Sequence, residues 1–165
     1  MIYVQLTPNE YIMAAHVGFM RQTSNICRGR NDAYGYTGIG YDIHILGCLG
    51  EYVVAKYLNT FWNGISALGV KDVGKNIQVR TTAKKDNRLI VHPNDADNDC
   101  FILVSSDGLC FSIHGYIYGV DAKRKEWWQS PQKGRPAYFV PQSALMDIHT
   151  LDYHAINNER YCTIS

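Results

Sequence analysis

The feature that most constrains how this chain folds is an apolar stripe at helical spacing between residues 43 and 58. The residues of the stripe share one helical face, and they are Ile43, Leu46, Leu49, Val53, Val54, Tyr57 and Leu58. Such spacing predicts an amphipathic helix that packs on a core, and Asp42 is its expected N-cap. Gly47 and Gly50 each cost a helix about 1 kcal/mol relative to alanine. We therefore expect this helix to lie close against a sheet or a substrate.

Strand patterns replace the helical pattern further along the chain. The run 77–82 alternates apolar and polar residues and ends in the β-branched Thr81 and Thr82. The run 100–104 is wholly apolar, which is typical of a central strand buried on both faces. The alternating run 110–120 is expected to pair back on it. Shorter strands are expected at 65–70, 89–91 and 137–140.

A helix start is also predicted near the N-terminus. Thr7 is the expected N-cap, Pro8 suits the first helical position, and Glu10 completes a capping box. The apolar periodicity after it fades near Gln22, so we expect the helix to end there. Two helices and the strands that follow predict an α/β or α+β fold, in which a mixed central sheet is flanked by helices.

Four polar side chains fall at particular places in this pattern. Glu51 lies in the helix, Asp72 in a turn, and Gln78 and Arg80 in the strand that follows. Alternation along a strand places Gln78 and Arg80 on one face, with Val79 on the other. Oxygen donors such as these bind hard cations, for example Mg²⁺. The sequence therefore predicts that the four side chains converge on one small site.

Two of these residues also have ordinary structural explanations. Aspartate is common in turns, which is where Asp72 lies. Glu51 is close to the apolar stripe, where an unpaired charge is costly, and a pair with Lys56 would satisfy it. The spacing of Glu51 alone favours such a pair. With Asp72, Gln78 and Arg80 downstream, we favour a functional site.

The order of these residues resembles that of the PD-(D/E)xK nuclease superfamily, over residues 42 to 106. Its members carry a helical Glu, then an Asp, then a Glu-x-Lys on a strand. Here Asp72 is similar to the Asp, and Gln78-Val79-Arg80 stands in place of Glu-x-Lys. Gln keeps an oxygen ligand without the charge, and Arg keeps the charge without the compact ammonium of Lys. The resemblance implies a restriction-endonuclease-like core.

The resemblance further implies a Mg²⁺- or Mn²⁺-dependent nuclease of phage or mobile-element type, which hydrolyses phosphodiester bonds of DNA and acts as a homodimer. The implied metal ligands are Glu51, Asp72, Gln78 and the carbonyl of Val79. Arg80 is expected to bind a nonbridging phosphate oxygen. The alternative is a catalytically inactive nuclease-fold module that binds nucleic acid or a protein partner. The neutral Gln78 and the permanently protonated Arg80 favour this alternative.

Basic side chains gather in four segments that are candidates for nucleic-acid contact. They are Arg28 and Arg30 in a Gly- and Tyr-rich loop, Lys84 and Lys85 in a hairpin turn, Lys123, Arg124 and Lys125 beside two tryptophans, and Lys133 and Arg135 in a later loop. Such cations bind phosphates, and neighbouring aromatic rings stack on unpaired bases. Solvated turns and loops are the alternative. The net charge of +1 argues against a polybasic coat but allows a local basic groove.

The length of 165 residues suits a single domain with a substantial core. Within residues 1–165 we expect an N-terminal helix and loop at 1–41, a core at 42–149 and a tail at 150–165. No apolar run is long enough to span a membrane, and the N-terminus lacks the pattern of a signal peptide. The five cysteines have no zinc-binding spacing. An odd number of cysteines without a signal peptide predicts free thiols in a reducing cytoplasm.

Two other residues are weaker candidates for chemistry. For neither His114 nor Cys48 does the sequence place a catalytic partner at a recognisable spacing. His114 lies in an expected strand and is interpreted as structural, and Cys48 is expected to be a buried apolar residue. Asp95, Asp97 and Asp99 lie in one loop, which lacks the glycine and terminal Glu of an EF-hand. We interpret it as a plain acidic loop.

Overall fold

The computed structural model of the chain describes residues 1–29, 40–64, 71–131 and 135–153. The strand expected at 65–70 and most of the expected tail lie outside these ranges. So do Arg30 and Lys133, two of the candidate nucleic-acid contacts. Within the described ranges, no helix is both long and apolar enough to cross a membrane.

The first helix begins where the sequence predicts and continues further than expected. α1 spans Pro8–Cys27 and opens with the predicted capping box. The Thr7 amide donates to Oε2 of Glu10 at 2.7 Å, and the Glu10 amide donates to the Thr7 hydroxyl at 3.3 Å. The expected end near Gln22 is wrong, because periodicity is only one of the influences that set where a helix ends.

The second helix, α2, spans Tyr41–Tyr57 and agrees with the predicted helix. Its N-cap is Gly40 in a left-handed conformation, so the expected cap by Asp42 is wrong. Asp42 lies in the first turn instead, where a carboxylate is favourable beside the positive end of the helix dipole. The hydroxyl of Thr23 lies 3.3 Å from the hydroxyl of Tyr41, so packing on α2 carries α1 past Gln22.

The main sheet has four strands. They are β1 (Ile2–Gln5), β2 (Ile77–Thr82), β4 (Cys100–Asp107) and β5 (Cys110–Tyr118). Their order is β1-β5-β4-β2, so β2 is an edge strand. β2 and β4 run parallel and the other pairs antiparallel, which makes the sheet mixed as predicted. The sequence analysis missed β1, because four residues are too few for a clear pattern.

A second, smaller sheet is entirely antiparallel. Its strands are β3 (Leu89–Val91), β6 (Trp128–Gln129) and β7 (Ala137–Val140), in the order β3-β7-β6. Short helical turns complete the described chain at Gly119–Ala122 (α3), Lys125–Trp127, Gln142–Ala144 and Ile148–Thr150. The strands expected at 89–91 and 137–140 are confirmed.

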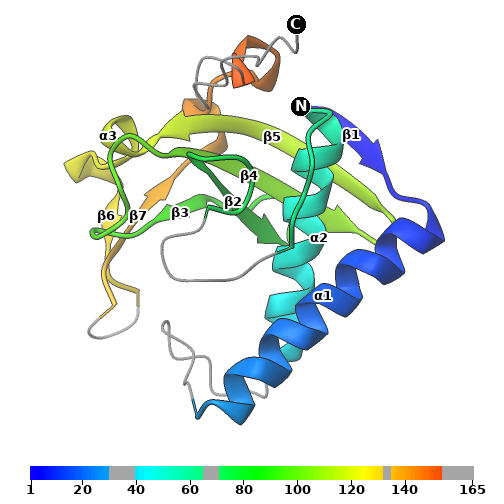
Figure 1. Ribbon diagram of the computed structural model, residues 1–165. Coiled ribbons are helices and arrows are strands. Elements are labelled where there is room, and N and C mark those ends of the chain that lie inside the picture. Colours follow the sequence, from blue (N-terminus) through cyan, green and yellow to red (C-terminus); the bar gives the residue numbers. More distant parts are fainter. Residues whose placement is uncertain (30–39, 65–70, 132–134, 154–165) are drawn as a thin grey trace, which may run out of the picture.

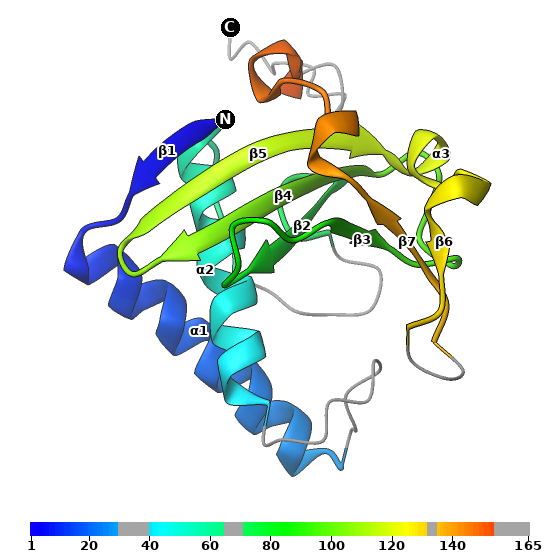
Figure 2. The ribbon, with the colours of Figure 1, turned by 180° about the vertical axis from the view of Figure 1, so that it is seen from behind.

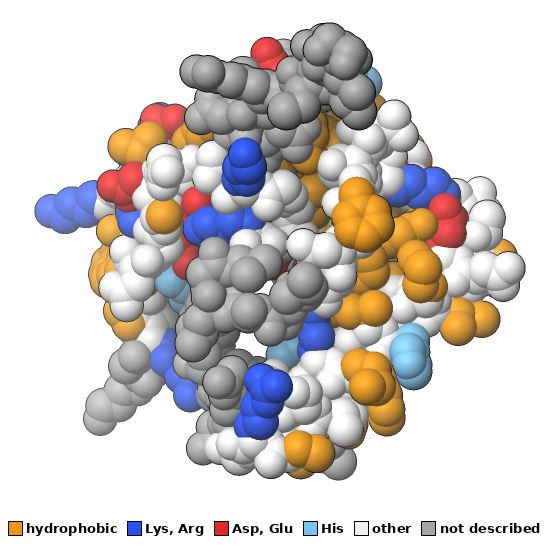
Figure 3. Space-filling view, viewed as in Figure 1, with side chains coloured by type: hydrophobic (Ala, Val, Ile, Leu, Met, Phe, Trp, Pro, Cys, Tyr) orange, Lys and Arg blue, Asp and Glu red, His pale blue; other side chains and the backbone are white. Residues whose placement is uncertain are grey.

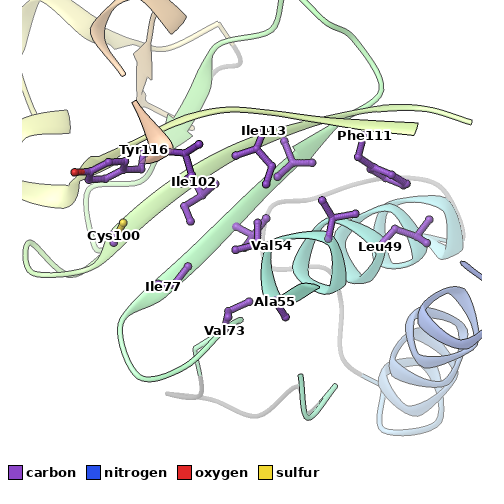
Figure 4. Packing of buried hydrophobic residues seen from close by; sticks show 14 of the residues in the cluster. Leu49, Val54, Ala55, Val73, Ile77, Cys100, Ile102, Phe111, Ile113 and Tyr116 are labelled. Atoms are coloured by element: carbon purple, nitrogen blue, oxygen red, sulfur yellow. The ribbon is translucent and has the colours of Figure 1, made fainter. Parts of the chain in front are cut away.

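The two faces of the main sheet have different cover, as Figures 1 and 2 show. α2 packs on one face with α1 beside it, and the smaller sheet lies towards the other. Under α2 the core contains Val54, Ile77 and Ile102 (Figure 4). The core on the opposite face includes Phe101 and Leu89. The molecule is therefore a mixed α/β fold of the α+β kind, with a mixed sheet flanked by helices.

Strand β2 divides its side chains between these two cores. Ile77 and Val79 belong to the cluster under α2. Gln78 and Arg80 point to the other face, where Gln78 is in register with Phe101 of β4. The predicted alternation is thus confirmed, and it places the two polar residues on the face opposite the helix that carries Glu51.

Candidate functional site at the edge of strand β2

Glu51 is a buried carboxylate whose two oxygens are both engaged. It lies on α2 with 6% of its surface exposed. Arg21 of α1 donates two hydrogen bonds to it, from Nη1 to Oε1 at 2.6 Å and from Nη2 to Oε2 at 2.8 Å. The indole of Trp62 donates to Oε2 at 3.0 Å. The suggested pair with Lys56 is wrong, because Lys56 binds Glu10 instead.

Close packing of the two long helices brings Arg21 to Glu51. A Cβ on Gly18 of α1 would lie only 2.6 Å from the Cα of Ile45 on α2, so glycine allows the backbones to approach. Arg21 follows one turn later. Sequence reasoning missed it, because the first helix was expected to fade there. A buried glutamate requires a cation, and in the sequence this requirement was the one indication that Glu51 has a basic partner.

Asp72 lies at the edge of β2 that no strand of the described ranges covers, and it is partly buried. The amide of Val79 donates to its Oδ2 at 2.7 Å, so the carboxylate takes a place that a neighbouring strand would fill. Within the described chain, Oδ1 makes no hydrogen bond. Burial and the nearby Glu51 carboxylate raise the pKa of Asp72 to about 6, against the opposing effects of the Val79 amide and of two arginines.

The Arg80 guanidinium lies over the same strand edge. Its Nη1 is 3.3 Å from Oε1 of Gln78 and 3.5 Å from the carbonyl oxygen of Val79. Its Nη2 pairs with Asp95 at 3.1 Å, and the guanidinium stacks 5.2 Å from the centre of the Phe101 ring. Arg80 is therefore held mainly by Asp95 and Phe101, while its contacts with the strand edge are long.

The structure thus brings together only part of the predicted set. Asp72, Gln78, Val79 and Arg80 meet along the edge of β2. Glu51 approaches Asp72 closely enough to raise its pKa, yet its oxygens are taken by Arg21 and Trp62. The expectation that Glu51 is free to bind a metal therefore does not agree with the geometry.

The remaining oxygens suit a loosely held Mg²⁺ better than a closed metal cage. Among the described residues, no group of three or more His, Cys, Asp or Glu side chains could hold a metal ion. Mg²⁺ commonly needs only one or two carboxylates, and water and substrate phosphates complete its shell. Asp72 Oδ1 offers one carboxylate oxygen, and Gln78 Oε1 and the Val79 carbonyl lie on the same strand edge. These donors are of the type that Mg²⁺ binds, and Nη1 of Arg80 contacts two of them.

Four of the expected nucleic-acid contacts in the described chain interact with other parts of the protein. Lys123 pairs with Asp97, Lys85 with Asp107, and Arg124 stacks on Trp127. Arg135 also has an interaction within the protein. Arg28, Lys84, Lys125 and Arg135 are exposed. On the face in Figure 3, the Lys and Arg side chains are scattered and form no continuous basic stripe.

The acidic loop is organised by ion pairs. Asp95 binds Arg80, Asp97 binds Lys123, and Asp99 binds Lys71. Hydrogen bonds from His92 and the charge of Arg80 outweigh the effect of burial and lower the pKa of Asp95 to about 2. The loop therefore anchors Arg80 beside the edge of β2, a role that the sequence did not reveal.

Of the two weaker candidates, His114 contacts Ser105, whereas Cys48 lies beside the Glu51–Arg21 pair. Nε2 of His114 lies 2.8 Å from the hydroxyl of Ser105, which is only 2% exposed. Cys48 is completely buried, and burial raises the pKa of its thiol to about 12. A buried hydroxyl and a protonated, buried thiol are poor nucleophiles. Both residues are interpreted as structural.

A pocket of about 480 Å³ adjoins the site. It lies between the first half of α2, the end of β2 and the loop that leads into β3, and Val79 and Arg80 line it. Arg88, in that loop, is an exposed cation at the same pocket.

In comparisons with known proteins, no protein-family model, no curated protein and no solved structure matches the chain.

Proposed function

We propose that this protein is a Mg²⁺- or Mn²⁺-dependent nuclease with a restriction-endonuclease-like core, which hydrolyses phosphodiester bonds of DNA in a reducing cytoplasm. One observation carries the proposal. Asp72, a carboxyl group with a pKa of about 6, lies at a strand edge beside Gln78 Oε1, the Val79 carbonyl and a guanidinium. Strongly shifted carboxyl groups among convergent polar atoms are typical of functional sites.

The chain's own residues have separate roles in this proposal. Asp72, once deprotonated, would hold the cation through Oδ1, and Gln78 and the Val79 carbonyl would be further oxygen donors. A bound Mg²⁺ or Mn²⁺ supplies water activation and charge neutralisation. Arg80 leaves its long contacts with the strand edge and binds a nonbridging phosphate oxygen as negative charge develops. The oxygen of a water molecule bonds to the phosphorus and its proton passes to solvent, one P–O bond breaks, and the leaving oxygen takes a proton from solvent.

Glu51 acts in this scheme through Asp72 and not as a ligand. Its negative charge contributes to the raised pKa of Asp72, and Arg21 fixes where that charge lies. Glu51 is thus a positioning residue.

The test is cleavage of single-stranded, duplex and branched DNA with Mg²⁺ or Mn²⁺. Asp72→Asn keeps an oxygen for the Val79 amide and removes the charge. Asp121→Asn is the matched control, because Asp121 is an exposed aspartate on α3. We expect cleavage by the natural protein and the control, with a loss of at least about a hundredfold in Asp72→Asn. Equal rates in all three proteins would refute the proposal.

A second candidate function is a catalytically inactive module that binds nucleic acid or a protein. Two features favour it. The ion pair with Arg21 occupies the Glu51 carboxylate, which is then not available to a metal, and Gln78 is neutral. The variant Gln78→Glu/Arg80→Lys separates the two functions. If cleavage appears only in that variant, while the natural protein shows salt-sensitive DNA binding, the inactive module is correct.

We also propose that two copies associate through α1. Large apolar side chains are exposed along this helix every seven residues. Ile12, Phe19 and Ile26 form one row, and Met13 and Met20 form the next. No Asp, Glu, Lys or Arg lies between residues 11 and 20, and Figure 3 shows hydrophobic side chains over α1. A seven-residue apolar repeat suits a partner helix, and a second copy provides an identical one.

A further inference from the structure

The pocket beside the strand edge has the walls of a small-molecule site. Its volume of about 480 Å³ lies within the range of such pockets. Ile43 and Leu46 of α2 form one apolar wall, and Ile90 and Leu103 form another. Apolar walls are poor partners for a phosphate group but good partners for the flat face of a ring.

The helical wall of the pocket has a gap at Gly47. A Cβ built on Gly47 meets no atom within 4 Å, so packing against the rest of the protein does not require glycine here. Glycine in the middle of a helix costs roughly 0.5–1 kcal/mol relative to alanine. The glycine therefore leaves the pocket wider than a side chain would.

The opposite wall is held in place before any ligand binds. The side chain of Gln142 donates to the carbonyl of Lys85 at 2.6 Å and to that of Asn87 at 3.0 Å. The side-chain Nδ2 of Asn87 donates to the Thr82 hydroxyl at 2.5 Å. These bonds fix the loop that carries Arg88, so the pocket is largely preformed.

Charge at the rim indicates what kind of molecule enters. Arg88 is exposed and makes no ion pair within the described chain, so it is available to a phosphate. Asp42 lies at the N-terminal end of α2 and repels an anion at that end. A neutral ring between Arg88 and Asp42, with a phosphate beside Arg88, satisfies the attraction at one end and avoids the repulsion at the other.

We infer that this pocket binds an unpaired nucleobase, so that the preferred substrate is single-stranded or locally unpaired nucleic acid. The inference rests on the proposed function, because Val79 and Arg80 belong both to the pocket and to the Asp72 site. A phosphate held at Arg80 places a neighbouring base at the pocket mouth. Bases stack on arginine planes and on apolar side chains when they leave the helix stack.

Binding to three fluorescent probes tests the inference without requiring cleavage. The probes are a twelve-nucleotide thymidine strand, an abasic strand of the same length and a closed hairpin duplex, all in EDTA. We expect the thymidine strand to bind at least about tenfold more tightly than the abasic strand, because a bound base contributes stacking energy. Equal affinity for the two strands would overturn the inference, since only phosphates would then be recognised.

Two variants locate the effect in the pocket. Gly47→Leu fills the gap with a good helix former, and Ile43→Ala removes part of a wall at a residue that is 43% exposed. We expect Gly47→Leu to lower thymidine-strand affinity to the abasic level and Ile43→Ala to lower it less. Circular dichroism verifies folding. Folded variants with unchanged preference would refute the pocket.

The two proposals fail in different ways. A protein that cleaves duplex and single strands equally, and that Gly47→Leu leaves unchanged, is a nuclease without a base pocket. A protein that binds the thymidine strand through Gly47 but cleaves no probe has the base pocket without the nuclease activity.

Discussion

Glu51 and Arg21 form the most buried ion pair in the described chain, with side-chain exposures of 7% and 13%. We expect Glu51→Gln to lower the free energy of unfolding by roughly 3 kcal/mol, because it leaves the Arg21 guanidinium buried without a counter-charge. Urea denaturation measures the loss.

The double variant Arg21→Met/Glu51→Leu is the control for this prediction. It removes both charges and fills similar space, so we expect it to regain much of the lost stability. If Glu51→Gln costs less than about 1 kcal/mol, as for an exposed pair, the pair is not the buried contact described above.

The need for a partner at Glu51 could be predicted from the sequence, but the identity of the partner could not. Position on the apolar stripe indicated burial, and burial of a carboxylate implies a cation. The nearest cation along the helix was Lys56. The actual partner lies 30 residues earlier on another helix, and only the packing angle of the two helices selects it.

The raised pKa of Asp72 predicts a pH-dependent stability. Between about pH 4 and pH 6 the folded protein keeps a proton that the unfolded chain releases, since folding raises this pKa from 3.8 to about 6. The protonated carboxyl contributes fully to the free energy of unfolding below pH 4, and this contribution is lost as the pH rises through 6. We therefore expect Asp72→Asn to be more stable than the natural protein above pH 6, by roughly 1–3 kcal/mol.

Thermal unfolding at pH 3.5, 5 and 7.5 checks this prediction. The difference between the two proteins should vanish at the lowest pH. Asp121→Asn should show no such trend, because Asp121 is exposed. A stability difference for Asp72→Asn that is the same at all three pH values would contradict the assigned pKa.

At the scale of elements, the two glycines of α2 have opposite roles. A Cβ on Gly50 would lie 1.8 Å from the Thr81 hydroxyl of β2, whereas one on Gly47 meets nothing within 4 Å. We expect Gly50→Ala to destabilise the protein by about 1–3 kcal/mol through overpacking. Gly47→Ala should stabilise it by roughly 0.5–1 kcal/mol, since alanine favours helices. Chemical denaturation of the two variants gives the comparison, and losses of equal size would contradict it.

Elements with a strong local signal could be predicted from the sequence. The capping box of Thr7 and Glu10 marked the start of α1, and the period-2 pattern marked β2 and its two faces. What escaped prediction depends on tertiary contact. β1 is defined by pairing with β5, and α1 is extended by contacts with α2. The alternation of Gln78 and Arg80 could likewise be predicted, but not which core they would face.

On the scale of the whole molecule, the exposed apolar rows of α1 predict a dimer. We expect light scattering to show two copies for the natural protein. Ile12→Glu/Met20→Glu should be monomeric, because four charges would then face one another across the interface. Val120→Glu is the control, since Val120 is 61% exposed and lies on α3. A natural protein that is monomeric at every concentration would contradict this surface assignment.

The proposed role of the Asp72 carboxylate is to hold a divalent cation at the edge of β2, and calorimetric titration with Mn²⁺ measures that binding. Ligand carboxylates must be deprotonated, so binding should be clear at pH 7.5 and weaker at pH 5, below the pKa of about 6. We predict one ion per chain for the natural protein and for Asp121→Asn, and none for Asp72→Asn. Absence of binding at pH 7.5, or equal binding by Asp72→Asn, would contradict the account.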